Sequence, residues 1–259
     1  MRDRLHYQTV GDPKRPALLL VHGFLSSNTQ WLPNVDLLAE RFFLVLAELW
    51  GHGDSPLPVD ESEFTIARYV EEFEHIRSEL NLECWGLVGQ SYAAGLTINY
   101  ALTYPQRVDG LIVTNSRSAF GDVVAARNEK AKRTQLAASN VAEKQLNNRH
   151  MPIHPFYAKR LPDDVKTKLV ACADNMTEDA INKGGLIHRA LNSEALIDSI
   201  TSPFMIANGV YEKSFQVDLD RLKAGRPDLK VIDMQGGHAV NIEAASEFNT
   251  AVINFFLNG

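Results

Sequence analysis

Short, uninterrupted apolar runs limit the fold of this chain more than any other feature of its sequence. They cover residues 17–21, 42–47, 84–88 and 110–114. A strand in a parallel sheet has this pattern, because helices cover the sheet above and below and bury both faces of the strand. The runs therefore predict four buried strands, and two further strands are predicted later in the chain, at residues 204–208 and 229–234.

Amphipathic helical patterns separate these runs. Between residues 66 and 80, apolar side chains recur at spacings of three and four, with Glu and Arg between them. A second helix is predicted after Ser91 and must end at Tyr104, because Pro105 disfavours helical backbone in the residue before it. A third is predicted from about residue 242 to 256. The alternation of strands and helices predicts an α/β fold with a mostly parallel central sheet flanked by helices.

The segment from residue 117 to 201 interrupts this alternation. It contains helix-forming polar stretches separated by Pro and Gly, and no convincing buried strand. It is also too long to be one plain loop. We therefore predict a core domain of residues 1–116 and 202–259, into which residues 117–201 are inserted as a helical cap.

Composition excludes several classes of protein. The chain of 259 residues is 45% hydrophobic and has a net charge of −6, which disfavours nucleic acid as a partner. Its first residues are polar, and no apolar run approaches the length of a membrane span, so we expect a cytoplasmic protein with no membrane contact. Cys84 and Cys172 are too few to indicate a disulfide framework.

Ser91 lies on a tight turn between a predicted strand and a predicted helix, in the sequence Gly89-Gln90-Ser91-Tyr92-Ala93. A serine on such a turn is held above the sheet, where it is accessible for nucleophilic attack. Ala93 stands where a second glycine is usual in this motif. The simpler alternative is a glycine-rich turn with an incidental serine.

A base and an acid for this serine are predicted at the same edge of the sheet. His238 follows the last predicted strand through a glycine turn, and Glu212 follows the strand before it. A carboxylate there would hold the imidazole in the tautomer that accepts the serine proton. Asp218 and Asp220 are alternative acids. Helix packing for His238 and surface charge for Glu212 are the simpler interpretations.

The turn His22-Gly23-Phe24 follows the first buried strand and lies at this edge too. The backbone N–H groups of Phe24 and Tyr92 are expected to converge there on a developing oxyanion. Such preorganised donors contribute about 3 to 4 kcal/mol each. His22 itself is expected to brace the loop.

Substrate contacts are less defined by the sequence, and core packing is the alternative for each candidate. The candidates are Trp31, Trp50, Met151, Ile153, Phe156 and Tyr157. His150 and His154 have the spacing of metal ligands on a helix, but Pro152 between them argues against a helix. No phosphate-binding glycine loop follows a strand. We therefore expect neither a metal nor a cofactor.

Together these motifs resemble the α/β-hydrolase fold family from about residue 7 to 256. They are His22-Gly23-Phe24, Gly51-His52-Gly53-Asp54-Ser55, Gly89-Gln90-Ser91, Gly209 with Glu212, and Gly237-His238. The chain order serine, acid, histidine is also that of the family. The resemblance implies a cap at residues 117–201 and a structural role for the turn that contains His52. The chain departs from the family pattern at three positions. Ala93 replaces the second glycine of the serine turn, and Glu212 and Glu48 stand where Asp is commoner in the family.

The resemblance and the candidate residues predict a serine hydrolase that cleaves a carboxylic ester or thioester through an acyl-enzyme on Ser91. A serine at this turn argues against the dehalogenase and epoxide-hydrolase branches, which use an aspartate. Acyl transfer, C–C hydrolysis, lyase chemistry and cofactor-free oxygenation stay open, as does a ligand-binding receptor with a degenerate triad. The expected partner is a small acyl substrate, and the expected state is a monomer or weak homo-oligomer.

Overall fold

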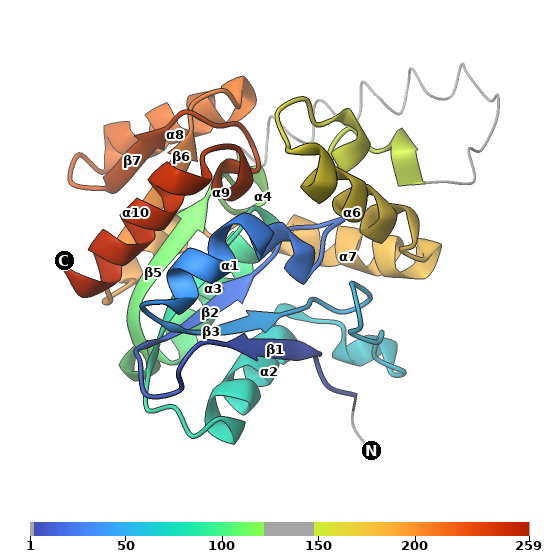
Figure 1. Ribbon diagram of the computed structural model, residues 1–259, viewed down its shortest axis with the longest axis horizontal. Coiled ribbons are helices and arrows are strands. Elements are labelled where there is room, and N and C mark those ends of the chain that lie inside the picture. The colour runs from blue at the N-terminus through green and yellow to red at the C-terminus, as the bar shows by residue number, and fades with distance from the viewer. Residues whose placement is uncertain (1–2, 122–147, 259) are drawn as a thin grey trace.

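A central sheet organises the computed structural model, which describes residues 3–121 and 148–258 (Figure 1). Its seven strands follow the spatial order β1-β3-β2-β4-β5-β6-β7. They are β1 (Tyr7–Val10), β2 (Ala17–Val21), β3 (Phe43–Ala47), β4 (Trp85–Gly89), β5 (Val108–Thr114), β6 (Phe204–Gly209) and β7 (Lys230–Met234). The six predicted strands are β2 to β7, which are all parallel, although β7 lies at the edge of the sheet and is exposed or half-buried apart from Met234. The predicted fold class is confirmed.

Strand β1 is the part of the sheet that the apolar runs do not indicate. It pairs antiparallel with β3, and Tyr7 lies opposite Ala47. Its four residues are half-buried or exposed, because it lies at the edge of the sheet. Such a strand lacks the continuous apolar signal of a strand that is buried on both faces.

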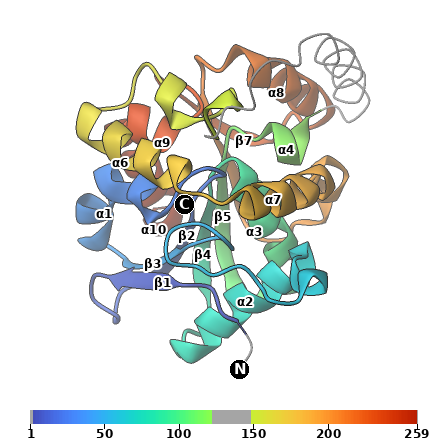
Figure 2. The ribbon, with the colours of Figure 1, turned by 90° about the vertical axis from the view of Figure 1, so that its right-hand side faces the viewer.

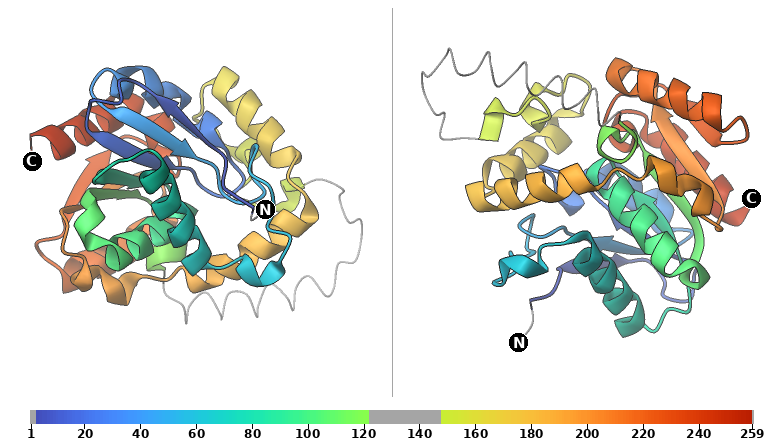
Figure 3. Two further views of the ribbon diagram at one scale, coloured as in Figure 1. Left: turned by 90° about the horizontal axis from the view of Figure 1, so that it is seen from below. Right: turned by 180° about the vertical axis from the view of Figure 1, so that it is seen from behind.

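Helices cover both faces of the sheet. The core helices are α1 (Leu32–Ala39), α2 (Ile66–Glu79), α3 (Tyr92–Thr103), α8 (Lys213–Gly225), α9 (Val240–Glu243) and α10 (Ala245–Leu257). Figure 3 shows α1 and α10 on the opposite side of the sheet from α2 and α3. Leu19 and Val21 of β2 pack with residues of α2 and α3, whereas Leu18 and Leu20 pack with residues of α1 and α10. Alternate residues of one strand thus fill two cores, which explains why the run is apolar throughout.

Two predicted helix ends have different outcomes. Helix α3 ends at Thr103, just before Tyr104 and Pro105, as predicted. The helix predicted from about residue 242 to 256 is present as α10, but it begins only at Ala245, because Ala244 has φ −125° and ψ 46° and separates α9 from α10. Asn241 of α9 is fully buried and bonded to groups outside the helix. The short α9 is therefore held by those bonds rather than by continuity with α10.

The chain between β5 and β6 is helical in its described part. It contains α4 (Arg117–Phe120), α6 (Asp163–Asp174) and α7 (Glu178–Ala190), and 3-10 turns at Asn148–His150, Pro155–Tyr157 and Glu194–Ser199. Residues 122–147 of the predicted cap lie outside the described residues. The division into a core of residues 1–116 and 202–259 and a cap of residues 117–201 stays a prediction.

Helices α6 and α7 contact the loops that follow the central strands. Cys172 Sγ of α6 lies 3.2 Å from Ser27 Oγ, which comes after β2. The Tyr92 hydroxyl, at the start of α3, donates to the carbonyl of Gly184 in α7 at 3.1 Å. Figure 2 shows α7 alongside α3. Among the described residues, no helix has both the length and the apolar character needed to cross a membrane.

Candidate active site

Ser91 occupies a strained turn between β4 and α3. Its backbone has φ 51° and ψ −108°, a conformation that costs a non-glycine residue about 1–3 kcal/mol. The Ser91 N–H donates to Thr114 Oγ1 at 3.1 Å, which ties the turn to the end of β5. A Cβ at Gly89 would lie 2.8 Å from the Ala93 carbonyl oxygen, so the strand and the helix meet too closely for a side chain there. The arrangement is the strand–turn–helix geometry that holds a serine above a sheet.

Glu212 and His238 form a hydrogen-bonded pair at the same edge of the sheet. Glu212 follows β6 and His238 follows β7, and His238 Nδ1 lies 3.0 Å from each carboxylate oxygen. If Nδ1 carries the proton and donates it to the carboxylate, Nε2 keeps its lone pair and is free to accept a proton. The geometry assigns that tautomer, since a carboxylate is a hydrogen-bond acceptor only.

The electrostatics of the pair raise the pKa of His238. Burial lowers this pKa, but the hydrogen bond to Glu212, the charge of Glu212 and the charge of Glu243 together raise it above the ordinary value of 6.5. The His238 side chain is 42% exposed, whereas the Glu212 side chain is only 16% exposed. The histidine is thus accessible and the acid is shielded behind it.

The alternative acids are placed elsewhere. The Asp218 carboxylate pairs with Arg117 at 3.3 Å and with Arg221 at 3.0 Å. Asp220 is exposed on α8. Of the three candidate acids, Glu212 is the one whose carboxylate contacts His238. The extra methylene of Glu, compared with the commoner Asp, is accommodated in this contact.

The side chain of Gln90 connects the histidine loop to the serine turn. Gln90 Nε2, next to Ser91, donates to the His238 carbonyl at 3.1 Å. A Cβ at Gly23 would overlap Gln90 Oε1 and lie 3.4 Å from the Ser91 Cβ, so the loop after β2 is close to the same turn. The ends of β2, β4 and β7 therefore meet around Ser91. No sequence motif pointed to Gln90 as the connecting residue.

The predicted oxyanion donors lie on two of these segments. Tyr92 is the first residue of α3, so its N–H has no acceptor within the helix. Phe24 is in the loop after β2, and its ring stacks on that of Tyr92 with 5.4 Å between ring centroids. The Gly23 N–H donates to Gln30 Oε1 at 3.3 Å, which fixes the turn before Phe24.

Two buried histidines support these loops as neutral groups. His22 Nδ1 donates to the Gly23 carbonyl at 2.7 Å, and its Nε2 accepts from the Leu49 N–H at 3.1 Å. Burial lowers the pKa of His22 to about 3 and that of His52 to about 4. His52 Nδ1 lies 3.0 Å from the Trp50 carbonyl. His22 thus braces the loop, as its sequence context indicates.

A network of buried amides, which was not predicted from the sequence, joins the loop after β2 to helix α9. Gln30 Nε2 donates to Asn241 Oδ1, and Asn241 Nδ2 donates to the Gln30 carbonyl and to Asn34 Oδ1. Asn34 Nδ2 also donates to Asn249 Oδ1 at 2.8 Å. The same Gln30 side chain accepts from Gly23. The four-residue spacing of Gln30 and Asn34 is the one sequence signal that could have indicated it.

The predicted substrate contacts are not brought together. Trp31 is fully buried against Phe248 of α10, and Trp50 is fully buried near Tyr69 of α2, each with 6.3 Å between ring centroids. With both indole rings enclosed by core side chains, the structure favours packing over the predicted contact with substrate.

The four candidates of residues 151–157 differ in burial. Met151 packs against a small buried cluster of Leu25, Ala173, Met176 and Ala180, whereas Ile153, Phe156 and Tyr157 are about half exposed. The Arg149 guanidinium stacks on Phe156, 4.6 Å from the ring centroid. The described contacts of Phe156 and Tyr157 are thus with the helical segment itself, whereas the cluster beside Met151 includes Leu25 of the loop after β2.

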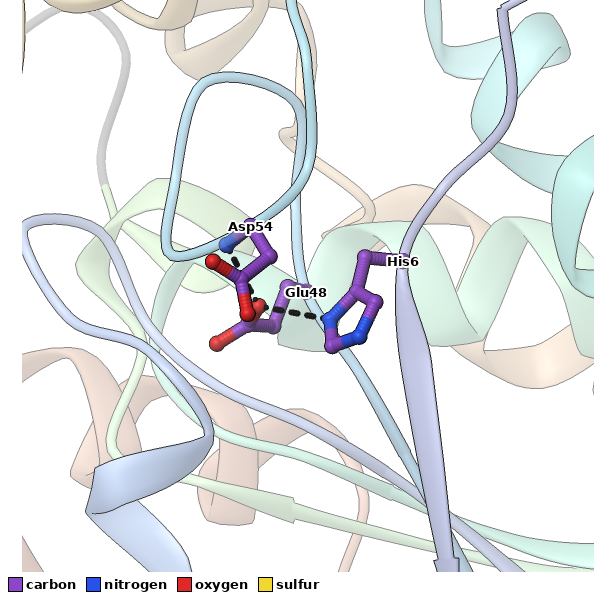
Figure 4. Close-up of side chains that lie close together, drawn as sticks. All are labelled: His6, Glu48 and Asp54. Atoms are coloured by element: carbon purple, nitrogen blue, oxygen red, sulfur yellow. Dashed lines mark hydrogen bonds and ion pairs between the residues drawn. The ribbon is translucent and has the colours of Figure 1, made fainter.

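One group of side chains in the described residues has the spacing of metal ligands: His6, Glu48 and Asp54 (Figure 4). Glu48 is buried and already accepts three hydrogen bonds, from the Asn28 N–H, the Asp54 N–H and His6 Nδ1, at 2.8 to 3.1 Å. These hydrogen bonds give the group a structural role, because they fix the turn after β3. Gly53 passes so close to Glu48 that a Cβ there would overlap the carboxylate.

Comparison with known proteins agrees with this geometry. The profile of the alpha/beta hydrolase fold family matches residues 16–245. The chain therefore belongs to the alpha/beta hydrolase fold family. An uncharacterized protein of Mycobacterium bovis is 33% identical over 108 residues, which span 42% of this chain and 31% of that protein. This chain thus matches only about a third of the length of that relative.

Relatives that match along nearly the whole chain are more distant in sequence. The carboxylesterase YbfK of Bacillus subtilis is 23% identical over 99% of this chain and 85% of its own length. Its crystal structure superposes with a TM-score of 0.70 at 21% identity, covering 100% of this chain and 89% of that one. The crystal structure of an epoxide hydrolase of Bacillus megaterium superposes with a TM-score of 0.75 at 22% identity, covering 98% of this chain and 97% of that one. The chain is thus a hydrolase-fold protein similar to enzymes of different chemistry.

Proposed function

We propose that this protein is a serine hydrolase that cleaves a carboxylic ester or thioester of a small molecule. The observation that carries the proposal is the Glu212–His238 pair, which lies at the sheet edge where Ser91 sits on its strained turn. Membership of a hydrolase family supports the proposal, and so does similarity to a carboxylesterase along nearly the full chain. A serine rather than an aspartate at position 91 favours acyl transfer over epoxide opening.

Acylation begins with attack of Ser91 Oγ on the substrate carbonyl carbon. His238 Nε2 takes the hydroxyl proton as the new C–O bond forms, and the carbonyl oxygen becomes an oxyanion. The N–H groups of Phe24 and Tyr92 donate to that oxyanion. When the tetrahedral intermediate collapses, the bond to the alcohol or thiol breaks, and the leaving group takes the proton from His238.

Deacylation repeats these steps with water as the nucleophile. His238 takes a proton from a water molecule as it attacks the acyl carbon, and returns the proton to Ser91 Oγ when the acid leaves. The 42% exposure of the His238 side chain supports access by water. Glu212 keeps the imidazole in the required tautomer and stabilises its protonated form in both half-reactions.

The test compares the wild type with Ser91→Ala on p-nitrophenyl esters from acetate to long acyl chains, with circular dichroism as the check on folding. We expect the wild type to turn over at least part of the series and Ser91→Ala to lose at least 10³-fold in kcat. A thiol-release assay on acyl thioesters of the same chain lengths separates the two leaving-group classes. Full activity in Ser91→Ala, or no activity of the wild type on any ester or thioester, would refute the proposal.

The proposal extends to the expected partner, location and assembly. We take a small acyl compound as the partner, with the acyl chain near the segment that contains Met151, and a cytoplasmic monomer or weak homo-oligomer as the working form. The chain-length optimum of the ester series measures the size of the acyl site, and Met151→Ala should shift it toward longer chains. Size-exclusion chromatography with light scattering measures the assembly.

A further inference from the structure

Both residues proposed to supply oxyanion donors are attached through their side chains to one glycine of helix α7. The Tyr92 hydroxyl donates to the Gly184 carbonyl at 3.1 Å. The Phe24 ring lies against the Gly184 Cα, so that a Cβ at position 184 would overlap Cε2 of Phe24 and lie 3.0 Å from its Cζ. The two rings also stack on each other. Phe24, Tyr92 and Gly184 thus form one packed unit.

The neighbouring glycine shows that this contact is specific to position 184. Gly184 and Gly185 are consecutive in α7, and each weakens the helix by about 0.5–1 kcal/mol relative to Ala. A Cβ at Gly185 would meet no atom within 4 Å, whereas one at Gly184 would meet the Phe24 ring. Packing therefore requires a glycine at position 184 only.

Other side chains of the loop after β2 are held by the same helical segment. Leu25, whose φ is 56°, is fully buried in a cluster with Ala173, Met176 and Ala180. Ser27 Oγ contacts Cys172 Sγ of α6. The loop therefore has strained backbone, and its side chains are fixed by α6 and α7 as well as by the core. A shift of the helical segment would move the Phe24 N–H.

We propose that Gly184 is a positioning residue for the oxyanion site, through which the docking of α7 sets where the Phe24 and Tyr92 N–H groups point. The proposal rests on the proposed hydrolase function. Tyr92 is fixed mainly by α3, whereas Phe24 is in a loop, so the Phe24 N–H is the donor that depends more on α7. Removal of an oxyanion donor costs about 10²–10³ in kcat, and displacement of one donor should cost part of that.

The test is Gly184→Ala with Gly185→Ala as the matched control, since both exchanges add the same methyl to the same helix. We expect Gly184→Ala to lower kcat on the best ester about 10- to 100-fold with KM changed less than about threefold, because the donor acts in the transition state. Gly185→Ala should stay within twofold of the wild type. Gly185→Ala should unfold at or above the wild-type temperature, because Ala favours the helix, whereas Gly184→Ala should unfold at a lower temperature than Gly185→Ala, because its methyl meets the Phe24 ring.

A second exchange separates positioning from general damage to the fold. Phe24→Leu removes ring atoms that the new methyl would overlap, so the double variant Gly184→Ala/Phe24→Leu should have a higher kcat than the product of the two single losses predicts. Tyr92→Phe, which removes only the hydroxyl bonded to Gly184, should lower kcat about three- to tenfold. Tyr92→Phe therefore tests the positioning role even if Gly184→Ala does not fold.

The outcomes distinguish this inference from the proposed function. If Ser91→Ala is inactive but Gly184→Ala matches Gly185→Ala in kcat, the positioning role is refuted and the hydrolase proposal stands. A rise in KM with unchanged kcat in Gly184→Ala would also refute it, because that pattern indicates a substrate contact. A wild type that is inactive on every ester and thioester would overturn both.

Discussion

Exchange of Glu212 for Gln is the sharpest test of how the candidate triad works. Both oxygens of Glu212 lie 3.0 Å from His238 Nδ1, and the side chain is 16% exposed. Gln has nearly the same shape but carries no charge, and its NH2 group can donate to Nδ1 and so favour the wrong tautomer. We expect kcat to fall about 10³- to 10⁴-fold, which corresponds to about 4–5.5 kcal/mol of transition-state stabilisation.

The pH dependence gives a second expectation whose sign follows from the structure. Activity requires neutral His238, so kcat/KM of the wild type should rise with pH through a pKa above 6.5. Burial is the largest influence on this pKa and lowers it, while Glu212 and Glu243 raise it. Exchange of Glu212 removes two of the three influences that raise this pKa, so the acidic limb should move to lower pH.

The measurement is a pH–rate profile of the wild type and Glu212→Gln between pH 5 and 9, with Asp220→Asn as the control for loss of one acidic charge from the same part of the chain. Asp220 is exposed on α8, and its exchange should change kcat less than twofold. A loss smaller than tenfold in Glu212→Gln, or an acidic limb that stays in place or moves upward, would refute the assignment of Glu212 as the orienting acid.

Two further predictions concern stability. Ser91→Gly should be inactive, yet in urea unfolding it should be more stable than Ser91→Ala by about 0.5–1 kcal/mol, because glycine adopts the φ of 51° without strain. Equal stability of the two variants would show that the turn stores no strain. Asn241→Ala should lower the free energy of unfolding by about 3 kcal/mol, since it leaves buried groups of Gln30 and Asn34 without partners; a loss below about 1 kcal/mol would show that the amide network contributes little.

The buried strands could be predicted from sequence because their burial on two faces makes each run apolar throughout. Their carboxyl ends then lie at one edge, so the placement of Ser91, Glu212 and His238 near that edge follows from chain order alone. The choice of Glu212 over Asp218 needed coordinates, because three carboxylates within nine residues look alike in sequence. Only the ion pairs of Asp218 with Arg117 and Arg221 show that it is engaged elsewhere.

Contacts between distant segments were the features that sequence could not indicate. Trp31 looks like a pocket residue, but long-range packing against Phe248 buries it. No proline or glycine marks the break at Ala244 in the sequence. The nearby Asn241 is held by residues more than two hundred positions earlier in the chain. In each case, tertiary contacts outweigh a local pattern.

The contact of Gln90 with the His238 carbonyl joins positions that are 148 residues apart in the chain. The entropy of such a closure must be lost before the contact forms, and non-local contacts of this kind slow folding. Ser91 also precedes His238 in the chain, so the serine turn is synthesised before its proposed base, and β6 and β7 must join the sheet before the two meet. Recovery of the proposed esterase activity during refolding would thus report the last stage of assembly, after the earlier strands have formed a sheet that spectroscopy already detects.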